Sequence, residues 1–200
     1  MPRPSDTLPL PLLIFAKAPV PGQVKTRLIP VLGAEGACAL YRRLLVLTLE
    51  QTRDWPGPRV LYCAPDTDDP LFAALAREQH LQLRPQAAGD LGLRMAQAFS
   101  EHPRGALLIG SDCPVLSNAH LLAAAEALQT HDCVILPSDD GGYVLIGQRQ
   151  PHPAPFRDMS WSHAQVLADT RQRLQEANLS LWLGPTLWDI DDPEDLARWH

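Results

Sequence analysis

The sequence predicts an α/β fold: a three-layer α/β/α sandwich with a mostly parallel central sheet. Short apolar runs alternate with longer segments of helical periodicity along the 200 residues. Several runs are apolar at successive positions, which is typical of strands buried on both faces. Strands that alternate with helices form right-handed crossovers, so helices should cover both faces of the sheet.

The length suits one domain. We expect a flexible lead at 1–9 and a single domain at 10–200.

The first elements are expected at 10–16, 33–55 and 59–65. Residues 10–16, LPLLIFA, are too short for a helix and apolar on both faces, so we expect a buried strand. The segment 33–55 places Leu40 and Leu44 on one helical face, which predicts a helix. Residues 59–65, RVLYCAP, form the next expected strand.

The middle of the chain continues the alternation. A helix is expected at 69–79, where Asp69 can cap the N-terminus ahead of Pro70. A short strand at 81–84 and a helix at 89–102 follow.

The clearest strand of the sequence is 106–112, ALLIGSD. A helix at 117–130 begins with Ser117 as its cap, and strands are expected at 133–138 and 143–147.

The chain closes with a helix at 162–178, a strand at 179–183 and a helical turn at 192–200. Ligands of open parallel sheets bind outside the carboxyl ends of the strands. The residues that follow each strand are therefore the candidate site.

Composition excludes several classes of protein. A net charge of −6 argues against a general nucleic-acid binder. The apolar stretch near the N-terminus is short and interrupted by proline, so we expect neither a signal peptide nor a membrane span. The four cysteines lack metal-site spacing and read as buried free thiols, which favours a cytoplasmic protein. Leu- and Ala-rich helix faces are compatible with a homodimer as well as with packing on the sheet.

Three cations follow the first strand: Lys17, Lys25 and Arg27, on a loop that contains prolines. Like charges repel unless an anion joins them, and Arg and Lys are suited to phosphate oxygens. The chain has no G-x-G-x-x-G, and Lys25 lies three residues after Gly22, so neither known phosphate loop is present. The pattern indicates a polyphosphate held by side chains; a solvated basic turn is the alternative.

Carboxylates follow other strands. Asp112 ends an apolar run before Pro114, where it would stand at the mouth of a cleft; a turn-capping role is the alternative. Mg²⁺ takes one or two carboxylates and completes its shell with waters and substrate phosphates.

Asp139 and Asp140 precede Gly141 and Gly142, which permit close backbone approach to a ligand. The same DDGG is equally a hairpin signal.

Asp189 and Asp191 alternate and would share one face of an extended segment. Asp192 reads as a helix cap ahead of Pro193. We therefore expect one Asp of this segment to serve the function and another to cap the helix.

Six segments together resemble a family of GT-A-fold, glycosyltransferase-like proteins of the nucleotide-diphospho-sugar transferase superfamily. They are FAKAPVPGQVKTRL, QAAGDLGLRM, LLIGSDCPVL, DDGGYVLIG, SWSHAQVLADT and DIDDPEDLARW, in the family's order. The family is similar in turn to the molybdenum cofactor and phospholactate guanylyltransferases. This chain departs from the family pattern at Asp192 and His163, where threonine is usual.

The resemblance implies roles for individual residues. Lys25, Arg27 and Asp112 would carry catalysis. The nucleotide and its phosphates would be bound by Lys17, Gly22, Lys25, Arg27, Gly89, Asp90 and Arg94. The second substrate would be bound by Asp140, Gly141, Gly142 and Trp161, and Mg²⁺ or Mn²⁺ by Asp112 with Asp189 or Asp191.

The resemblance implies a divalent-metal-dependent transferase that uses a nucleotide or nucleotide sugar and a small-molecule acceptor. Nucleotidyl transfer from a nucleoside triphosphate and glycosyl transfer from a nucleotide-diphospho-sugar both remain open. A non-catalytic nucleotide-binding or sensor module on the same fold is the alternative from a different class.

Overall fold

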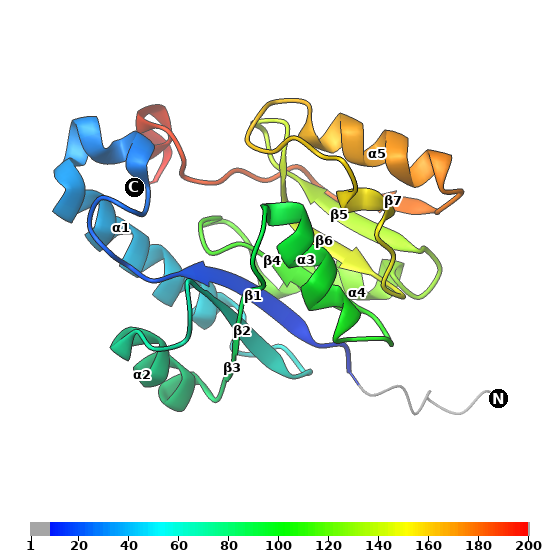
Figure 1. Ribbon diagram of the computed structural model, residues 1–200, viewed down its shortest axis with the longest axis horizontal. Coiled ribbons are helices and arrows are strands. Elements are labelled where there is room, and N and C mark those ends of the chain that lie inside the picture. Colours follow the sequence, from blue (N-terminus) through cyan, green and yellow to red (C-terminus); the bar gives the residue numbers. More distant parts are fainter. Residues whose placement is uncertain (1–8, 200) are drawn as a thin grey trace.

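A computed structural model of the protein describes residues 9–199 (Figure 1). The expected lead at 1–9 therefore lies, except for Pro9, outside the described residues. Among the helices of the described part, none is both long and apolar enough to cross a bilayer.

Seven strands form one sheet in the order β3-β2-β1-β4-β6-β5-β7. The strands are β1 Leu12–Lys17, β2 Arg59–Ala64, β3 Gln82–Pro85, β4 Ala106–Ile109, β5 Cys133–Pro137, β6 Tyr143–Gln148 and β7 Leu181–Leu183. β6 runs antiparallel to its neighbours β4 and β5, and the other pairs are parallel. The predicted mostly parallel sheet is confirmed.

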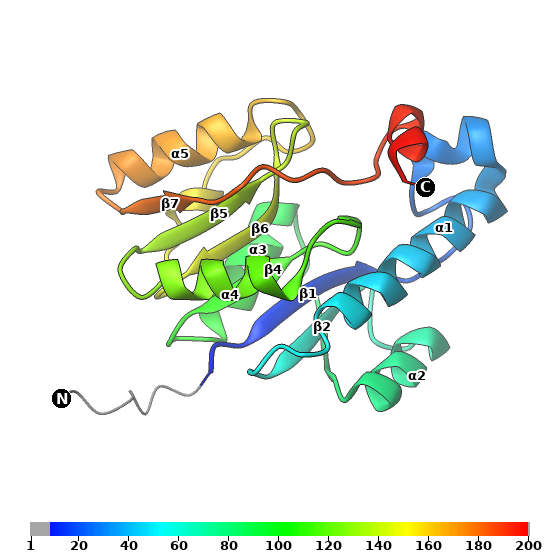
Figure 2. The same cartoon turned by 180° about the vertical axis from the view of Figure 1, so that it is seen from behind.

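Helices cover both faces of the sheet, as predicted. They are α1 Ile29–Gln51, α2 Pro70–Gln79, α3 Leu91–Ser100, α4 Asn118–Ala127 and α5 Val166–Glu176, with short 3₁₀ turns η1 Thr26–Leu28, η2 Ala154–Phe156 and η3 Pro193–Arg198. α3 and α5 lie on the face seen in Figure 1, and α1, α2 and α4 on the face seen in Figure 2. The three layers form because the strands are apolar on both sides.

β1 illustrates how alternation divides the core in two. Leu12 and Ile14 belong to the cluster that includes residues of α1, α2 and α4. Leu13 and Phe15 belong to the cluster that includes residues of α3 and α5. All four are buried, so a run of successive apolar residues serves two cores at once.

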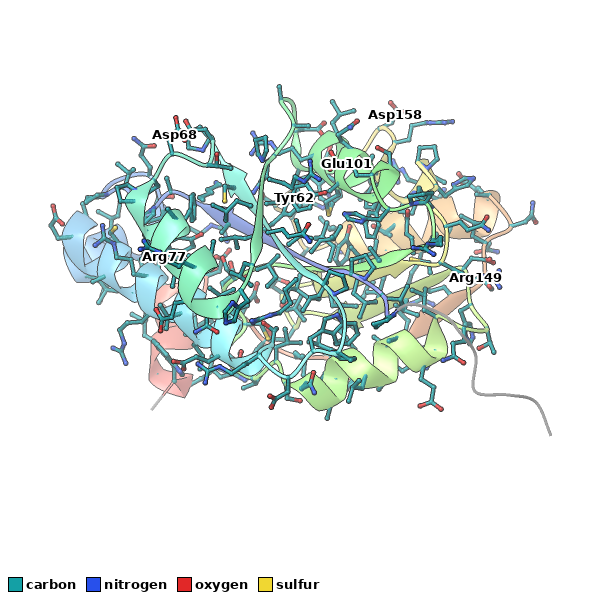
Figure 3. The ribbon with its side chains drawn as sticks, turned by 90° about the horizontal axis from the view of Figure 1, so that it is seen from below. Tyr62, Asp68, Arg77, Glu101, Arg149 and Asp158 are labelled. Atoms are coloured by element: carbon teal, nitrogen blue, oxygen red, sulfur yellow. The ribbon has the colours of Figure 1, made fainter. Side chains whose placement is uncertain are left out.

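Polar contacts fix some helices to the sheet and start others. The hydroxyl of Tyr62 on β2 donates to the Glu101 carboxylate just after α3, at 2.8 Å (Figure 3). Asp69 caps α2 and Ser117 caps α4, as the sequence predicts.

Some boundaries differ from the prediction. α1 begins at Ile29 instead of residue 33, because the residues ahead of Gly33 are helical as well. Gly33, with a positive φ of 71°, forms a kink inside the helix. β4 ends at Ile109, so Asp112 lies in the loop beyond the strand. α5 begins at Val166 instead of residue 162, and Ser162 has a left-handed φ of 64°.

The hairpin reading of DDGG is confirmed, because β5 and β6 are antiparallel neighbours joined at this turn. Asp140 accepts a hydrogen bond from the Gly142 N–H at 2.9 Å. Gly141 has a φ of 91°, and a Cβ there would lie 2.1 Å from the carbonyl oxygen of Ala164. These residues are needed by the turn itself.

Residues 184–199, the C-terminal segment, run from β7 across to the start of α1 (Figures 1 and 2). Ile190 is fully buried against Leu28, Leu40 and Leu44, and the expected cap is present, with Asp192 preceding Pro193. Partly buried hydrophobic residues add to this contact: Ile29, Trp188, Leu196 and Trp199. The segment thereby spans the edge of the sheet at which β1 and β4 end.

Candidate functional site

A cleft of about 660 Å³ opens at the carboxyl ends of β1 and β4. The two strands are parallel, with Ile14 beside Ile109, so Lys17 and Asp112 each follow that pair by three residues. Nine predicted site residues line the cleft: Lys17, Lys25, Arg27, Gly89, Asp90, Arg94, Asp112, Trp161 and Asp191. The position agrees with the rule that open α/β sheets bind ligands at strand ends.

Lys25 lies between two carboxylates. Its Nζ is 3.0 Å from Asp112 Oδ2 and 2.9 Å from Asp191 Oδ1, and its side chain is only 5% exposed. Burial alone lowers the pKa of Lys25, but the charges of Asp112 and Asp191 outweigh it and raise the pKa above its ordinary value. The ammonium therefore stays charged inside the cleft.

The backbone of Lys25 is unusual as well. Its φ of 47° lies in the left-handed region, which a residue with a side chain rarely adopts. The turn ahead of Lys25 contains Gly22, whose φ of 81° is a backbone conformation that glycine adopts readily. Gly22, which was predicted to bind phosphate, does not line the cleft. Strain of this kind persists where the surroundings impose it, and it is concentrated at functional sites.

Arg27 shares one of these carboxylates, Asp191, and approaches it from the solvent side. Its Nη1 is 3.3 Å from Asp191 and 3.6 Å from Asp192, and its side chain is 51% exposed. An exposed pair of this kind contributes little stability, so the guanidinium is available to an anionic ligand.

The C-terminal segment delivers Asp191 to this cluster. The Ile190 N–H donates to the backbone carbonyl of Asp112 at 3.1 Å, which ties the two carboxylate-bearing segments together. The Asp195 carboxylate accepts from the N–H groups of Asp191 and Asp192, at 3.0 and 2.8 Å. Distant parts of the sequence thus meet around Lys25.

Asp189 faces a different partner. The Ser138 hydroxyl donates to its Oδ1 at 2.7 Å. Burial first, and then the nearby charge of Asp112, raise the pKa of Asp189 to about 7, with smaller contributions from Asp140 and Asp191. An acidic side chain held against other carboxylates destabilises the native state and marks a candidate functional site.

We expect the substitution Asp189→Asn to stabilise the protein in a pH-dependent way. The pKa of Asp189 is 3.8 in the unfolded chain and about 7 in the native protein. Because the native state holds this proton more tightly, the free energy of unfolding of the wild type falls as the pH rises between these two values. In a chelating buffer the variant should melt at least about 3 °C above wild type at pH 8 and nearly together with it at pH 4. Differential scanning calorimetry at both pH values measures this; an equal difference at pH 4 and pH 8 would refute the electrostatic cause.

The carboxylates have the chemistry of a hard-cation site. Mg²⁺ and Mn²⁺ prefer oxygen ligands, and Asp112 and Asp191 already share one cation, the Lys25 ammonium. Among residues 9–199, no three His, Cys, Asp or Glu side chains converge as a ready-made metal site. The residues therefore fit an ion held by one or two carboxylates together with substrate oxygens and water.

The far wall of the cleft is formed by the start of α3. Asp90 caps this helix by accepting from the Leu93 N–H at 2.8 Å, and Arg94 Nε donates to the Gly89 carbonyl at 2.9 Å. A Cβ at Gly92 would lie 2.8 Å from the Trp161 ring, so this glycine leaves the space that the indole occupies. The arrangement fixes Arg94 and Trp161 beside the cleft.

Asp140, Gly141, Gly142 and Asp189 lie outside the lining of the cleft. Their binding roles remain predictions, since the structure gives each a local partner instead.

Sequence reasoning missed Tyr41, Gln86 and Ser111, which also line the cleft. Ser111 stands beside Asp112 after a strand, and that position was a usable signal. Gln86 opens the QAAGDLGLRM segment of the family resemblance, which was its only signal. Tyr41 carries no comparable signal, because it lies within the expected helix at 33–55.

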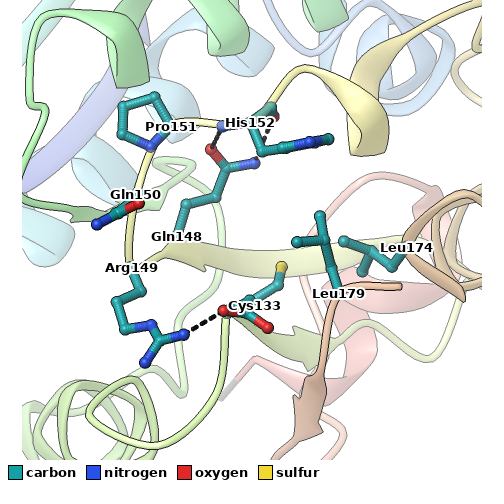
Figure 4. A pocket seen from close by; sticks show the side chains of 9 residues that line it. Cys133, Gln148, Arg149, Gln150, Pro151, His152, Leu174 and Leu179 are labelled. Atoms are coloured by element: carbon teal, nitrogen blue, oxygen red, sulfur yellow. Dashed lines mark hydrogen bonds and ion pairs between the residues drawn. The ribbon is translucent and has the colours of Figure 1, made fainter. Parts of the chain in front are cut away.

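A second cavity of about 110 Å³ lies at the opposite edge of the sheet, near the end of β6 (Figure 4). The Gln148 amide is bonded to the backbone of His152 in both directions, and Arg149 pairs with Asp132. Gln148, Arg149 and Asp132 thus already have partners within the protein, so their side chains offer little to a ligand.

Fold and cleft together define the class of the protein: it has the fold of nucleotide-diphospho-sugar transferases and related nucleotidyltransferases. The chain belongs to the family described as "Uncharacterized protein conserved in bacteria (DUF2064)", whose profile matches residues 47–163. The predicted resemblance is confirmed. No curated protein matches the chain in sequence.

Solved structures support the same assignment. A protein from Desulfovibrio desulfuricans G20, provisionally described as a nucleotide-diphospho-sugar transferase, is 30% identical, with a TM-score of 0.82 over 93% of this chain and 84% of its own. The fold also matches 4-diphosphocytidyl-2C-methyl-D-erythritol synthase from Anaerococcus prevotii DSM 20548, at 13% identity and a TM-score of 0.62, covering 95% and 94%. It matches CMP:2-keto-3-deoxy-manno-octonic acid synthetase complexed with CTP, at 8% identity and a TM-score of 0.61, covering 96% of each chain.

Proposed function

We propose that the protein is a divalent-metal-dependent transferase that uses a nucleotide, and that it transfers a nucleotidyl group from a nucleoside triphosphate to a small acceptor. The observation that carries the proposal is the buried ammonium of Lys25 between Asp112 and Asp191, at the strand ends of a nucleotide-binding fold. Taking these charged groups out of water costs stability, and such clusters are concentrated at functional sites.

The three cations have distinct positions toward a phosphate chain. Lys17 and Arg27 are exposed on the rim, and Lys25 is buried at the floor. In the reaction, an acceptor oxygen would bond to the α-phosphorus while the bond from that phosphorus to the bridging oxygen breaks. The leaving pyrophosphate gains negative charge, which Lys25 and Arg27 are placed to stabilise.

Asp112, with Asp191, would hold the divalent ion, which supplies charge neutralisation and orientation of phosphate oxygens. The carboxylates that bind it also determine where the Lys25 ammonium rests. A cation on these carboxylates would compete with the Lys25 ammonium, which would then be placed to bond to phosphate oxygens.

Nucleotidyl transfer is favoured because a triphosphate carries enough charge to use all three cations. Two of the solved structures with this fold are named for products or ligands that contain cytidine phosphates.

Glycosyl transfer from a nucleotide-diphospho-sugar is the second candidate. The 30% identical protein is named for that substrate class, and the same cleft would hold a nucleoside diphosphate leaving group.

A thermal-shift panel tests the proposal. Nucleoside triphosphates, nucleoside diphosphates and nucleotide sugars are each added with Mg²⁺, with Mn²⁺ and with a chelator. A ligand that binds only the native state raises the melting temperature by mass action. We expect at least one nucleotide to do so in a metal-dependent way.

Product analysis on the stabilising nucleotide then separates the reactions. Pyrophosphate release with an acceptor supports nucleotidyl transfer, and nucleoside diphosphate release supports glycosyl transfer. Stabilisation without turnover by any acceptor supports a binding module, and no stabilisation by any nucleotide contradicts the proposal.

A further inference from the structure

Two hydroxyl groups line the same cleft as Lys25, Asp112 and Asp191. Tyr41 extends from α1, and Ser111 follows β4 immediately before Asp112. Both residues are 5% exposed, and both line the cleft. They come from segments seventy residues apart, so their meeting is a property of the fold.

One of the two hydroxyl protons of this pair has no hydrogen-bond acceptor among residues 9–199. The Tyr41 oxygen accepts from the Lys17 N–H at 2.7 Å and lies 3.3 Å from the Ser111 hydroxyl oxygen. The pair has two hydroxyl hydrogens, of which one is used between the two residues. For the other, residues 9–199 provide no hydrogen-bond acceptor.

A buried donor without an acceptor is costly, and such a group is retained where a ligand accepts the bond. Tyr41 and Ser111 are otherwise buried and both line the cleft, so an external acceptor reaches them from the cleft. The cleft at this point is lined by the Lys17, Lys25 and Arg27 cations, which attract an anion. Burial, the largest cause, raises the pKa of the Tyr41 hydroxyl, so it remains a neutral donor.

We propose that the Tyr41–Ser111 hydroxyl pair donates one hydrogen bond to a phosphate oxygen of the substrate bound by Lys17 and Lys25. This inference rests on the proposed function and adds two residues to its phosphate-binding site. A hydroxyl donor does not change charge, so it adds directional binding where the ammonium groups act mainly as point charges.

The pair makes a specific prediction, because either hydroxyl can supply the surplus proton. In the Tyr41→Phe variant, the hydroxyl proton of Ser111 no longer bonds to Tyr41 and can point into the cleft. In the Ser111→Ala variant, the hydroxyl proton of Tyr41 can do the same. Each single substitution should therefore weaken anion binding by no more than about 3-fold. The double variant loses both donors and should bind about 10- to 100-fold more weakly, well beyond the product of the single effects.

Isothermal titration calorimetry with inorganic tripolyphosphate in a chelating buffer measures this without a metal or a known base. Tyr62→Phe combined with Ser100→Ala is the matched control, because it removes one tyrosine and one serine hydroxyl outside the cleft. The melting temperature of each unliganded variant is recorded alongside. A purely structural role lowers the melting temperature and leaves tripolyphosphate affinity unchanged, which would overturn the inference.

If the double variant does not fold, a measurement on the wild-type protein tests the inference instead. The chain has three tyrosines, so ¹³Cζ-labelled tyrosine gives three resonances, which Tyr62→Phe and Tyr143→Phe assign by elimination. Tripolyphosphate should shift the Tyr41 resonance more than the other two. Binding with no selective shift at Tyr41 refutes the inference alone, whereas no binding of tripolyphosphate or of any nucleotide refutes the proposed function with it.

Discussion

Asp112→Asn will lower turnover of the nucleotide substrate by at least about 10³-fold. The substitution keeps the shape of the side chain but removes the charge that both Lys25 and a divalent ion require at this strand end. Steady-state kinetics on the nucleotide that the thermal-shift panel identifies, at saturating Mg²⁺, measure the loss. Nucleotide binding in a chelating buffer should change much less, since the cations of the first loop remain.

Asp68→Asn is the matched control for this variant. Asp68 lies in the loop between β2 and α2, outside the cleft lining, and its replacement should leave turnover within 2-fold of wild type. If Asp112→Asn retains a tenth or more of wild-type turnover, this carboxylate does not hold the metal. Retention of metal-dependent nucleotide binding in that variant would favour a binding module.

Lys25→Met will have opposite effects on two ligands. Tripolyphosphate affinity should fall about 100-fold, because a buried ammonium at the floor of the cleft is lost. Mg²⁺ affinity in the absence of nucleotide should rise at least about 10-fold, because Asp112 and Asp191 lose the cation that now lies 3.0 and 2.9 Å from them. Calorimetric titration with tripolyphosphate alone and with Mg²⁺ alone measures both.

Arg27→Met serves as the comparison within the same loop. Arg27 contacts Asp191 from an exposed position, so its removal should weaken tripolyphosphate binding only a few-fold and leave Mg²⁺ affinity nearly unchanged. Unaltered Mg²⁺ affinity in Lys25→Met would show that the ammonium and the ion do not compete for these carboxylates.

Local patterns predicted most of the fold. Runs such as LLIF in β1 are apolar at every position, and only a strand between two helical layers buries such a run completely. Caps at Asp69 and Ser117 also follow from local chemistry, since a side-chain oxygen bonds to an N–H a few residues away. The start of α1 was missed because the apolar pattern does not reveal a kink at Gly33.

The sequence predicted the charged residues of the site but not how they pair, because local patterns do not reveal contacts between distant segments. Charged residues after strands stand out in a sequence, and Lys17, Lys25, Arg27 and Asp112 all line one cleft. Which of the C-terminal carboxylates would reach Lys25 could not be read from alternation alone. The structure directs Asp191 to Lys25 and Asp189 to Ser138, and that division depends on how the C-terminal segment packs against α1.

The amino-acid order by itself determined the layered α/β architecture, the strand ends as the place of the site, and the gathering of cations at the end of β1 and in the loop that follows it. These features depend on neighbours within a few residues, where periodicity and charge can be read directly. Only the tertiary structure decided that Lys25 bridges Asp112 and Asp191 and that Tyr41 meets Ser111 in the same cleft. Such contacts join segments up to 166 residues apart, and their distances depend on the packing of the whole core.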